Sequence, residues 1–137
     1  MHKMSIAHFI QVTRLTMKVE RAASNPHLVS DDGWARTAHH WRCTIKRGAR
    51  RMVVPFSQGS AHTDAPTLET VLDCLASDAS GYLNADTFEA WAGELGYDTD
   101  SRKAEHTYRT IEVQTAQLGK LLGEELIMRL TCEVERL

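Results

Sequence analysis

The chain of 137 residues is 42% hydrophobic and 25% charged, which is typical of one globular domain and excludes a disordered chain. It is long enough to bury a core without disulfide or metal support. No apolar run approaches the roughly 18–20 residues that span a bilayer, so the sequence predicts no transmembrane helix.

The acidic and basic residues are unevenly distributed along the chain. Residues 1–63 contain ten Lys/Arg and three acids, whereas residues 64–137 contain six Lys/Arg and fifteen acids. The formal charges of the two halves are therefore +7 and −9, which sum to the net charge of −2. The stretch 33–63 has no acid at all. Such asymmetry indicates an electrostatic partner, although it names no reaction.

The first third of the chain predicts a short helix, a strand and a loop. Residues 4–12 predict the helix, because apolar residues recur there at helical spacing. Residues 16–22 alternate, with Met17 and Val19 on one side, as in a half-buried strand. The polar residues 24–33 predict a loop. The apolar stretch at the start is too short and interrupted for a signal peptide, so the expected location is the cytoplasm.

Residues 40–47 and 51–57 predict a β-hairpin around Gly48-Ala49. Apolar residues alternate with polar or charged residues along the first strand and recur at every second position of the second. Pro55 lacks a backbone N–H, which indicates an edge strand or the end of a strand. With residues 16–22, the hairpin forms a three-stranded antiparallel sheet that has one apolar face and needs a cover.

The acidic half predicts three to four helices that supply this cover. Pro66 suits the first turn of one helix, and Asp86 with Glu89 resembles a capping box at the start of the next. Asp100 or Ser101 is expected to cap a long final helix.

The predicted fold class is therefore α+β, in a single domain over residues 1–137. Residues 1–80 form an α–β–β–β–α unit in this prediction, and residues 81–137 form a helical extension.

The predicted binding site is a basic face on the hairpin and the strand before it. Its residues are Lys18, Arg42, Lys46, Arg47, Arg50 and Arg51. Such a face attracts phosphate or an acidic protein surface. Double-stranded RNA-binding domains share the α–β–β–β–α order, but the second helix here opens with the acidic stretch PTLETVLD, where those domains carry basic residues. The alternative is a solvated sheet face, partly neutralised by the acidic helices of the same chain.

Trp34 stands out because it lies in a polar segment. It is either an exposed aromatic anchor for a partner or a cap on the edge of the sheet. The three cysteines, Cys43, Cys74 and Cys132, are odd in number and widely separated, which predicts reduced thiols without a disulfide framework.

Neither a metal centre nor a catalytic site is predicted. His39, His40 and Cys43 lie close in sequence, and His62 follows in a later loop. Adjacent histidines on a strand point to opposite faces, and no CxxC or HExxH spacing is present. Whether these four bind a metal is left open, and no cofactor is expected. Ser57, Ser60, His62 and Asp64 include the residue types of a nucleophilic triad, but any polar loop offers these types. A non-enzymatic protein is expected.

Three stretches carry a resemblance to a known family. They are FSQGSAH (56–62), PTLETVLDCLASDA (66–79) and FEAWAGELGYDTDSRKAEHTY (88–108). The chain resembles, over nearly its whole length, a family of small, uncharacterised accessory proteins of tailed bacteriophages and prophages. The resemblance implies a bacterial host cytoplasm and a protein that binds a host factor, in the manner of anti-CRISPR and other anti-defence inhibitors.

The leading hypothesis is a non-enzymatic binding protein that blocks a host protein or ribonucleoprotein complex sterically. The alternative is direct binding of RNA or DNA through the basic hairpin. The acidic helices offer a second surface, which imitates phosphate. A basic and an acidic face on one chain also complement each other between copies, so a homodimer is a further hypothesis.

Overall fold

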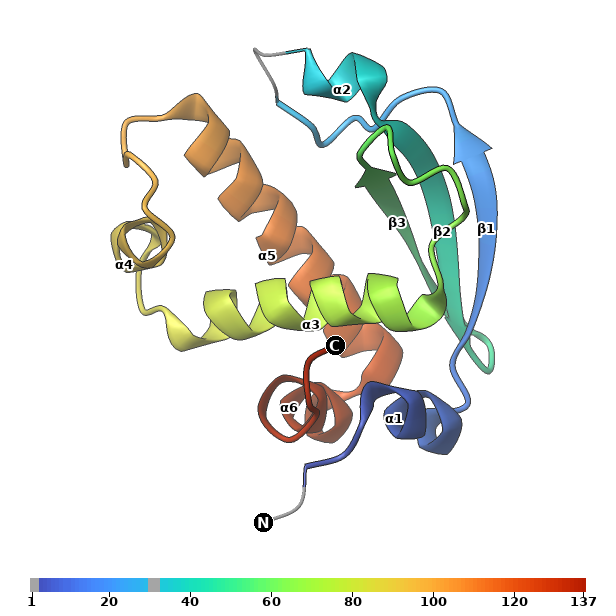
Figure 1. The fold of residues 1–137 in the computed structure, drawn as a ribbon. Helices are drawn as coiled ribbons and strands as arrows, with labels where there is room; N and C mark the ends of the chain where they lie inside the picture. The colour runs from blue at the N-terminus through green and yellow to red at the C-terminus, as the bar shows by residue number, and fades with distance from the viewer. Residues whose placement is uncertain (1–2, 30–32) are drawn as a thin grey trace.

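The computed structural model describes residues 3–29 and 33–137, so residues 30–32 of the predicted loop lie outside the described part. The elements in chain order are α1 (Ile6–Thr13), β1 (Thr16–Ala22), α2 (Trp34–Thr37), β2 (His39–Arg47), β3 (Arg50–Gln58), α3 (Leu68–Asn84), α4 (Phe88–Glu94), α5 (Arg102–Leu122) and α6 (Glu124–Cys132). The predicted α+β class is confirmed: a short helix precedes a three-stranded antiparallel sheet, and the remaining large helices follow it (Figure 1).

The sheet has the order β1-β2-β3, with both neighbouring pairs antiparallel. Arg47 pairs with Arg50 across the two-residue turn Gly48-Ala49. Gly48 has φ 59° and Ala49 does not have a positive φ, as in a type II′ turn with glycine at its first central position. The predicted hairpin is confirmed: β2 begins one residue earlier than predicted, and β3 extends one residue further at each end. β3 is an edge strand, as Pro55 indicated.

The four-residue helix α2 was not predicted. It lies just before β2 in the segment that the sequence assigns to a polar connection. Gly33 precedes it with φ 81°, and Ala38 N donates to the Trp34 carbonyl at its end. One turn of helix has no apolar periodicity to detect, so its position depends on tertiary contacts.

Four helices begin with a hydroxyl side chain that accepts a backbone N–H. The capping residues are Ser5, Thr67, Thr87 and Ser101. Ser101 was one of the two predicted caps of the long helix. The prediction for α4 was wrong by one residue, because Thr87 and not Asp86 accepts the N–H of Ala90. Pro66 likewise lies before the cap of α3 and outside the helix.

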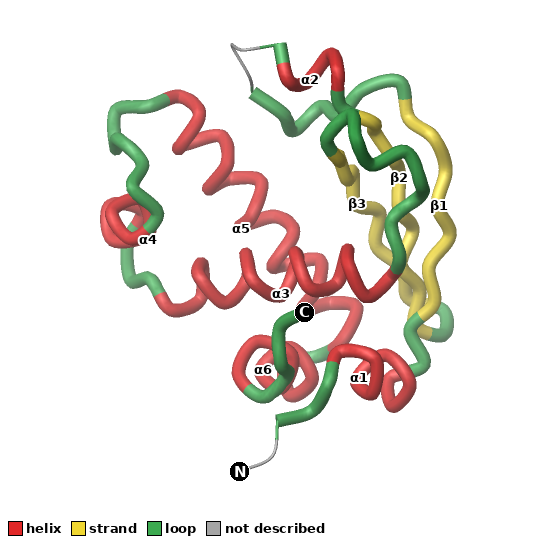
Figure 2. Tube along the Cα trace, in the orientation of Figure 1, coloured by secondary structure: helices red, strands yellow, loops and turns green. Residues whose placement is uncertain are grey.

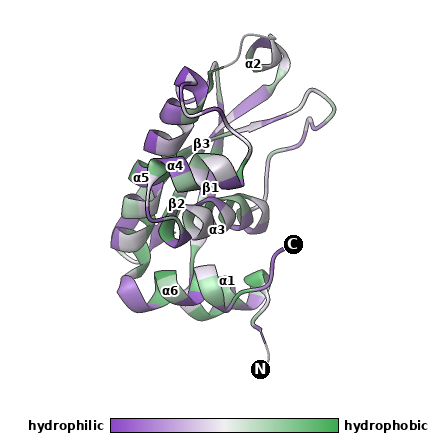
Figure 3. Cartoon of the chain, turned by 90° about the vertical axis from the view of Figure 1, so that its left-hand side faces the viewer, coloured by the Kyte–Doolittle hydropathy of each residue, from purple (hydrophilic) through white to green (hydrophobic). Residues whose placement is uncertain are grey.

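The apolar face of the sheet is covered by helices, with α5 in contact with β2 and β3 and α3 packed against α5 (Figures 1 and 2). The buried residues of this core that come from the hairpin are Trp41, Cys43, Ile45, Met52 and Val54. Ile45 and Cys43 have no exposed surface. Figure 3 shows hydrophilic and hydrophobic residues interspersed along α5, as expected of a helix with one buried side.

A second, aromatic cluster lies at the far end of α3 and α5, where α4 packs (Figure 1). Trp91 is its centre: its ring is stacked on Tyr97 with centroids 5.5 Å apart and meets Tyr108 edge-on at 5.1 Å. Ile111 and Ala92 are buried beside it. The cluster fixes α4 without any contribution from the sheet.

The first prediction concerns the core of the sheet. Ile45→Ala should lower the free energy of unfolding by about 2–5 kcal/mol, because it leaves a cavity beneath α5. Val53→Ala is the matched control on the opposite face of the hairpin, and its effect should stay below about 1 kcal/mol. Urea denaturation of both variants measures the difference. Equal effects of the two substitutions would contradict this assignment of faces.

Candidate functional site

The outer face of the sheet presents four cationic side chains to solvent. They are Lys18 on β1, Arg42 and Lys46 on β2, and Arg51 on β3, and all four are exposed. Side chains alternate along each strand, so these residues lie opposite the apolar set that meets the helices. Lys46 and Arg51 are direct cross-strand partners. We call these four residues the outer basic face.

The centre of the outer basic face is weakly polar. Thr44 pairs with Lys18 on one side and with Val53 on the other. Val53 keeps 39% of its surface exposed, although it is a large apolar residue. An exposed apolar residue beside charged residues is a combination that occurs in protein–protein interfaces, whose cores are depleted of charge and whose rims are polar.

Glu20 is the acidic residue among the outward-facing positions of the three strands. It pairs in register with Arg42, and its carboxylate lies 3.3 Å from Lys18 Nζ. Both side chains of this ion pair are more than half exposed, so the pair contributes no more than about 1 kcal/mol. Four cations and one acid leave the face with a formal charge of 4 − 1 = +3.

The acidic helices do not neutralise this face through ion pairs. Among residues 3–29 and 33–137, every ion pair joins side chains at most four positions apart in the chain. They are Lys18–Glu20, Arg109–Glu112, Arg129–Glu125 and Arg129–Glu133. None of these pairs connects the basic half of the chain to the acidic half, and none of them includes Arg42, Lys46 or Arg51 of the face.

Arg47 and Arg50 lie on the other side of the hairpin from the outer basic face. Arg47 Nη1 donates to the carbonyl oxygens of Leu121 (3.4 Å) and Leu122 (3.2 Å), and Arg50 Nη1 donates to that of Lys120 (3.4 Å). These are the last carbonyls of α5, which have no partner within the helix and carry its partial negative charge. The structure thus divides the six predicted residues into four on the face and two that cap α5.

The second prediction tests this division. Arg47→Met should lower the free energy of unfolding by about 1 kcal/mol, because it removes hydrogen bonds from a charged group to the end of α5. Arg51→Met, on the outer face, should change the same quantity by no more than about 0.5 kcal/mol. Urea denaturation measures both. Equal effects would mean that the contacts of Arg47 contribute nothing to stability.

Trp34 lies on α2 beside the edge strand β3. It lines a groove of about 180 Å³ together with Phe56 of β3 and with Val71 and Asp78 of α3. Its side chain is 39% exposed. This position agrees with a cap on the sheet edge, and the role of Trp34 as a partner anchor stays a prediction.

The two adjacent histidines take different hydrogen-bond partners. Arg21 Nη1 donates to His39 Nδ1 at 3.0 Å, so the neutral ring carries its proton on Nε2 and donates it to the Ser60 carbonyl at 3.2 Å. His40 is 7% exposed, and its Nε2 donates to the Ala35 carbonyl, which can only accept. Its Nδ1 therefore accepts from another residue.

That residue is Ser57, which is the cross-strand partner of His40. The Ser57 hydroxyl donates to His40 Nδ1 at 2.8 Å and accepts from Asn25 Nδ2 at 3.0 Å. The pairing fixes α2 and the segment after β1 to the sheet. The contact between His40 and Ser57 could have been predicted from the sequence. If residue 47 pairs with residue 50 across the turn, residues 40 and 57 are cross-strand partners. The set of Ser57, Ser60, His62 and Asp64, from which no catalytic site was predicted, does not include His40, the histidine that contacts Ser57.

The four residues considered for a metal lie in separate environments. Cys43 is buried in the core, whereas His62 is exposed in the loop after β3. His39 and His40 hydrogen-bond to the groups described above. In the part of the chain that the structure describes, no three His, Cys, Asp or Glu side chains gather in a group that fits a metal ion.

The third prediction concerns thiol reactivity. Burial raises the pKa of Cys43 to about 11, so at pH 8 only about a thousandth of this thiol is ionised, and the core shields it as well. Cys74 and Cys132 are exposed. A thiol reagent at pH 8 should therefore modify two groups per native chain and three in guanidinium chloride. Burial and the nearby Asp78 and Asp73 raise the pKa of Cys74, so a higher pH should accelerate its reaction.

A count of three reactive thiols in the native protein would contradict the placement of Cys43 in the core. Cys43→Ala separates the two outcomes, because it should leave the native count at two and lower the denatured count to two.

Comparison of the chain with models of known protein families, with curated proteins and with solved structures finds no match. Within the described residues, no helix combines the length and the apolar character needed to cross a bilayer. The chain is therefore an α+β protein, and its outer basic face is a candidate electrostatic binding surface.

Proposed function

We propose that this protein is a non-enzymatic binding protein whose outer basic face holds an acidic surface of a protein partner. The observation that carries the proposal is the exposed Val53 on the edge strand β3, beside the exposed cations of the hairpin. Apolar contact at Val53 supplies affinity, and the neighbouring charges select an acidic partner and accelerate its association.

A protein partner fits this face better than a nucleic acid does. The outward positions of β1, β2 and β3 include no Phe, Tyr or Trp, so the face offers no ring on which bases of a single strand stack. A formal charge of +3 is also small for a phosphate backbone. The start of α3 carries Glu69 and no basic residue, which removes the contact that a double-stranded RNA-binding domain makes there.

The family resemblance gives this proposal a context. A phage-encoded accessory protein acts in the cytoplasm of a bacterial host, and its partner is then a host protein or ribonucleoprotein complex. Binding through the sheet blocks a surface that the host factor needs, which is the mode of action of an anti-CRISPR or other anti-defence inhibitor.

The fourth prediction tests the outer basic face directly. Tagged protein expressed in a bacterial host should co-purify a partner that the double variant Arg42→Glu, Lys46→Glu loses, because the acidic surface of the partner then meets like charge. Val53→Asp should have the same effect, because it replaces the exposed apolar residue of the face by an acid. The matched control is Arg102→Glu, an exposed cation at the start of α5 that should leave the partner bound. Mass spectrometry of the purified material measures all three.

Retention of the partner by the double variant would contradict the proposal. Nucleic-acid binding is tested on the same variants with fluorescent RNA and DNA oligonucleotides. Four phosphate contacts predict a slope of log K against log[salt] of about −3 to −4. Tight oligonucleotide binding with that slope, lost in the double variant, would replace the protein partner by a nucleic acid.

A further inference from the structure

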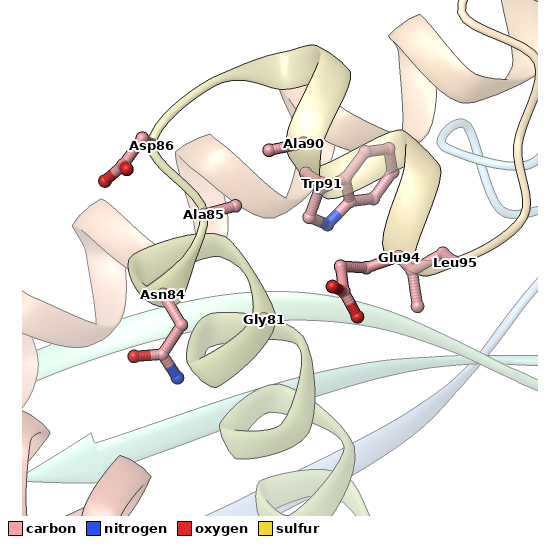
Figure 4. A pocket seen from close by; sticks show the side chains of 8 residues that line it. All are labelled: Gly81, Asn84, Ala85, Asp86, Ala90, Trp91, Glu94 and Leu95. Atoms are coloured by element: carbon pink, nitrogen blue, oxygen red, sulfur yellow. The ribbon is translucent and has the colours of Figure 1, made fainter.

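A second candidate site lies at the other end of the molecule, between the last turns of α3 and the helix α4. It is an open pocket of about 440 Å³, within the usual range of ligand sites (Figure 4). Its lining includes Gly81 from α3 and Trp91, Glu94 and Leu95 from α4 and the residue after it. None of these residues belongs to the outer basic face.

Trp91 contributes a hydrogen-bond donor that has no partner among the residues that the structure describes. The residue is 2% exposed, and its ring is held between Tyr97 and Tyr108. In residues 3–29 and 33–137 no hydrogen bond involves its indole nitrogen, which Figure 4 shows directed into the pocket. A donor fixed in this way is suited to an acceptor that a ligand brings, such as a carbonyl oxygen.

Gly81 is a glycine that the fold itself does not require. It lies within α3, where glycine is less favourable than alanine, and its φ is not positive. A Cβ atom placed on it meets no atom within 4 Å. Because Gly81 lines the pocket, that Cβ would stand in the space of the pocket, so the missing side chain keeps this wall open.

The surroundings of the pocket are acidic. Residues 64–101 contain nine Asp/Glu and no Lys or Arg, so no cation of this stretch compensates them. Figure 4 shows the Glu94 carboxylate on the same side of the pocket as the Trp91 nitrogen, facing Gly81, whereas Asp86 is turned away from Trp91. Leu95 remains 58% exposed at the rim. The pocket thus offers a carboxylate, an apolar wall and one N–H donor.

We propose that this pocket binds a basic side chain from an extended segment of a partner protein. The cationic head pairs with Glu94, its aliphatic stem lies on Leu95, and a backbone carbonyl of the segment accepts the indole N–H of Trp91. A free small cation satisfies the carboxylate but brings no acceptor for Trp91, which favours a peptide. This site is independent of the outer basic face, and either one can fail without the other.

The experiment is a titration of the full chain with the blocked tripeptide Ala-Arg-Ala, followed by the indole N–H resonances in ¹H–¹⁵N spectra. The chain has three tryptophans, so three such resonances are expected. Trp91→Phe identifies the one that belongs to Trp91. Trp34→Phe and Trp41→Phe identify it by elimination if the first variant does not fold. The Trp91 resonance should move in a saturable way, because its N–H gains an acceptor.

Two substitutions should weaken the binding about tenfold or more: Glu94→Gln, which removes the charge, and Gly81→Ala, which fills the space. The matched control for Gly81→Ala is Gly93→Ala on α4. Gly93 also has open space at its Cβ position but does not line the pocket, so this variant should bind as the parent does. Both alanines favour helix, so loss of folding does not account for a difference between them.

Several results would overturn the proposal. One is a Trp91 resonance that stays in place at millimolar peptide, and another is unchanged affinity in Gly81→Ala. Equal affinity for the peptide with citrulline in place of arginine would remove the role of charge. Equal affinity for ethylguanidinium would replace the peptide by a free cation. Self-association that Gly81→Ala abolishes, without peptide binding, would assign the pocket to a second copy of the chain. The double variant Arg42→Glu, Lys46→Glu should leave the titration unchanged.

Discussion

The arrangement of this molecule depends on the burial of one face of a three-stranded sheet. A sheet of this size is stable only if its apolar face is covered, and α5 provides that cover by packing on β2 and β3 while α3 packs against α5. The hairpin also fixes where α5 ends, because Arg47 and Arg50 donate to its last carbonyls. The same two strands therefore supply the apolar surface on which the helix lies and the polar groups at which it stops. As a consequence, the helices are committed to one side of the sheet and the other side remains open to solvent.

The solvent-exposed side of the sheet is basic because side chains alternate between the two sides along each strand. Successive residues of a strand face opposite sides of the sheet. Ile45 on β2 therefore has no exposed area, while Lys46 beside it reaches solvent. The basic residues of this half can thus be numerous without entering the core. Their concentration on one face follows from the register, which places Lys46 against Arg51 and leaves Thr44 and Val53 between the charges. The candidate binding surface thus follows from the pleat of the sheet.

The fold could be predicted from the sequence where apolar residues repeat regularly and the local structure does not depend on tertiary contacts. The hairpin was found to within one residue at each end, since alternation and a Gly-Ala turn are local signals. Arg47 was counted with the basic face because it lies at the turn, although its odd-numbered position matches that of Trp41 and Ile45 and already indicated the inner side. The short helix α2 had no such signal, because it is fixed by the contact of His40 with the Ala35 carbonyl. The pocket beside Trp91 was not foreseen either, since it depends on how two helices separated by a loop meet.

The uneven distribution of charge admitted two interpretations: binding of partners, or mutual neutralisation of the two halves of the chain. Neutralisation requires ion pairs between the hairpin and the helices, and among the described residues each ion pair stays within four positions of the chain. Charges that face solvent and are farther apart than about 10 Å are screened at moderate salt. The outer basic face and the acidic surroundings of Glu94 consequently act as separate surfaces of opposite sign. Two such surfaces on one small chain allow it to contact an acidic and a basic region of the same partner, and simultaneous contact raises the affinity above that of either surface alone.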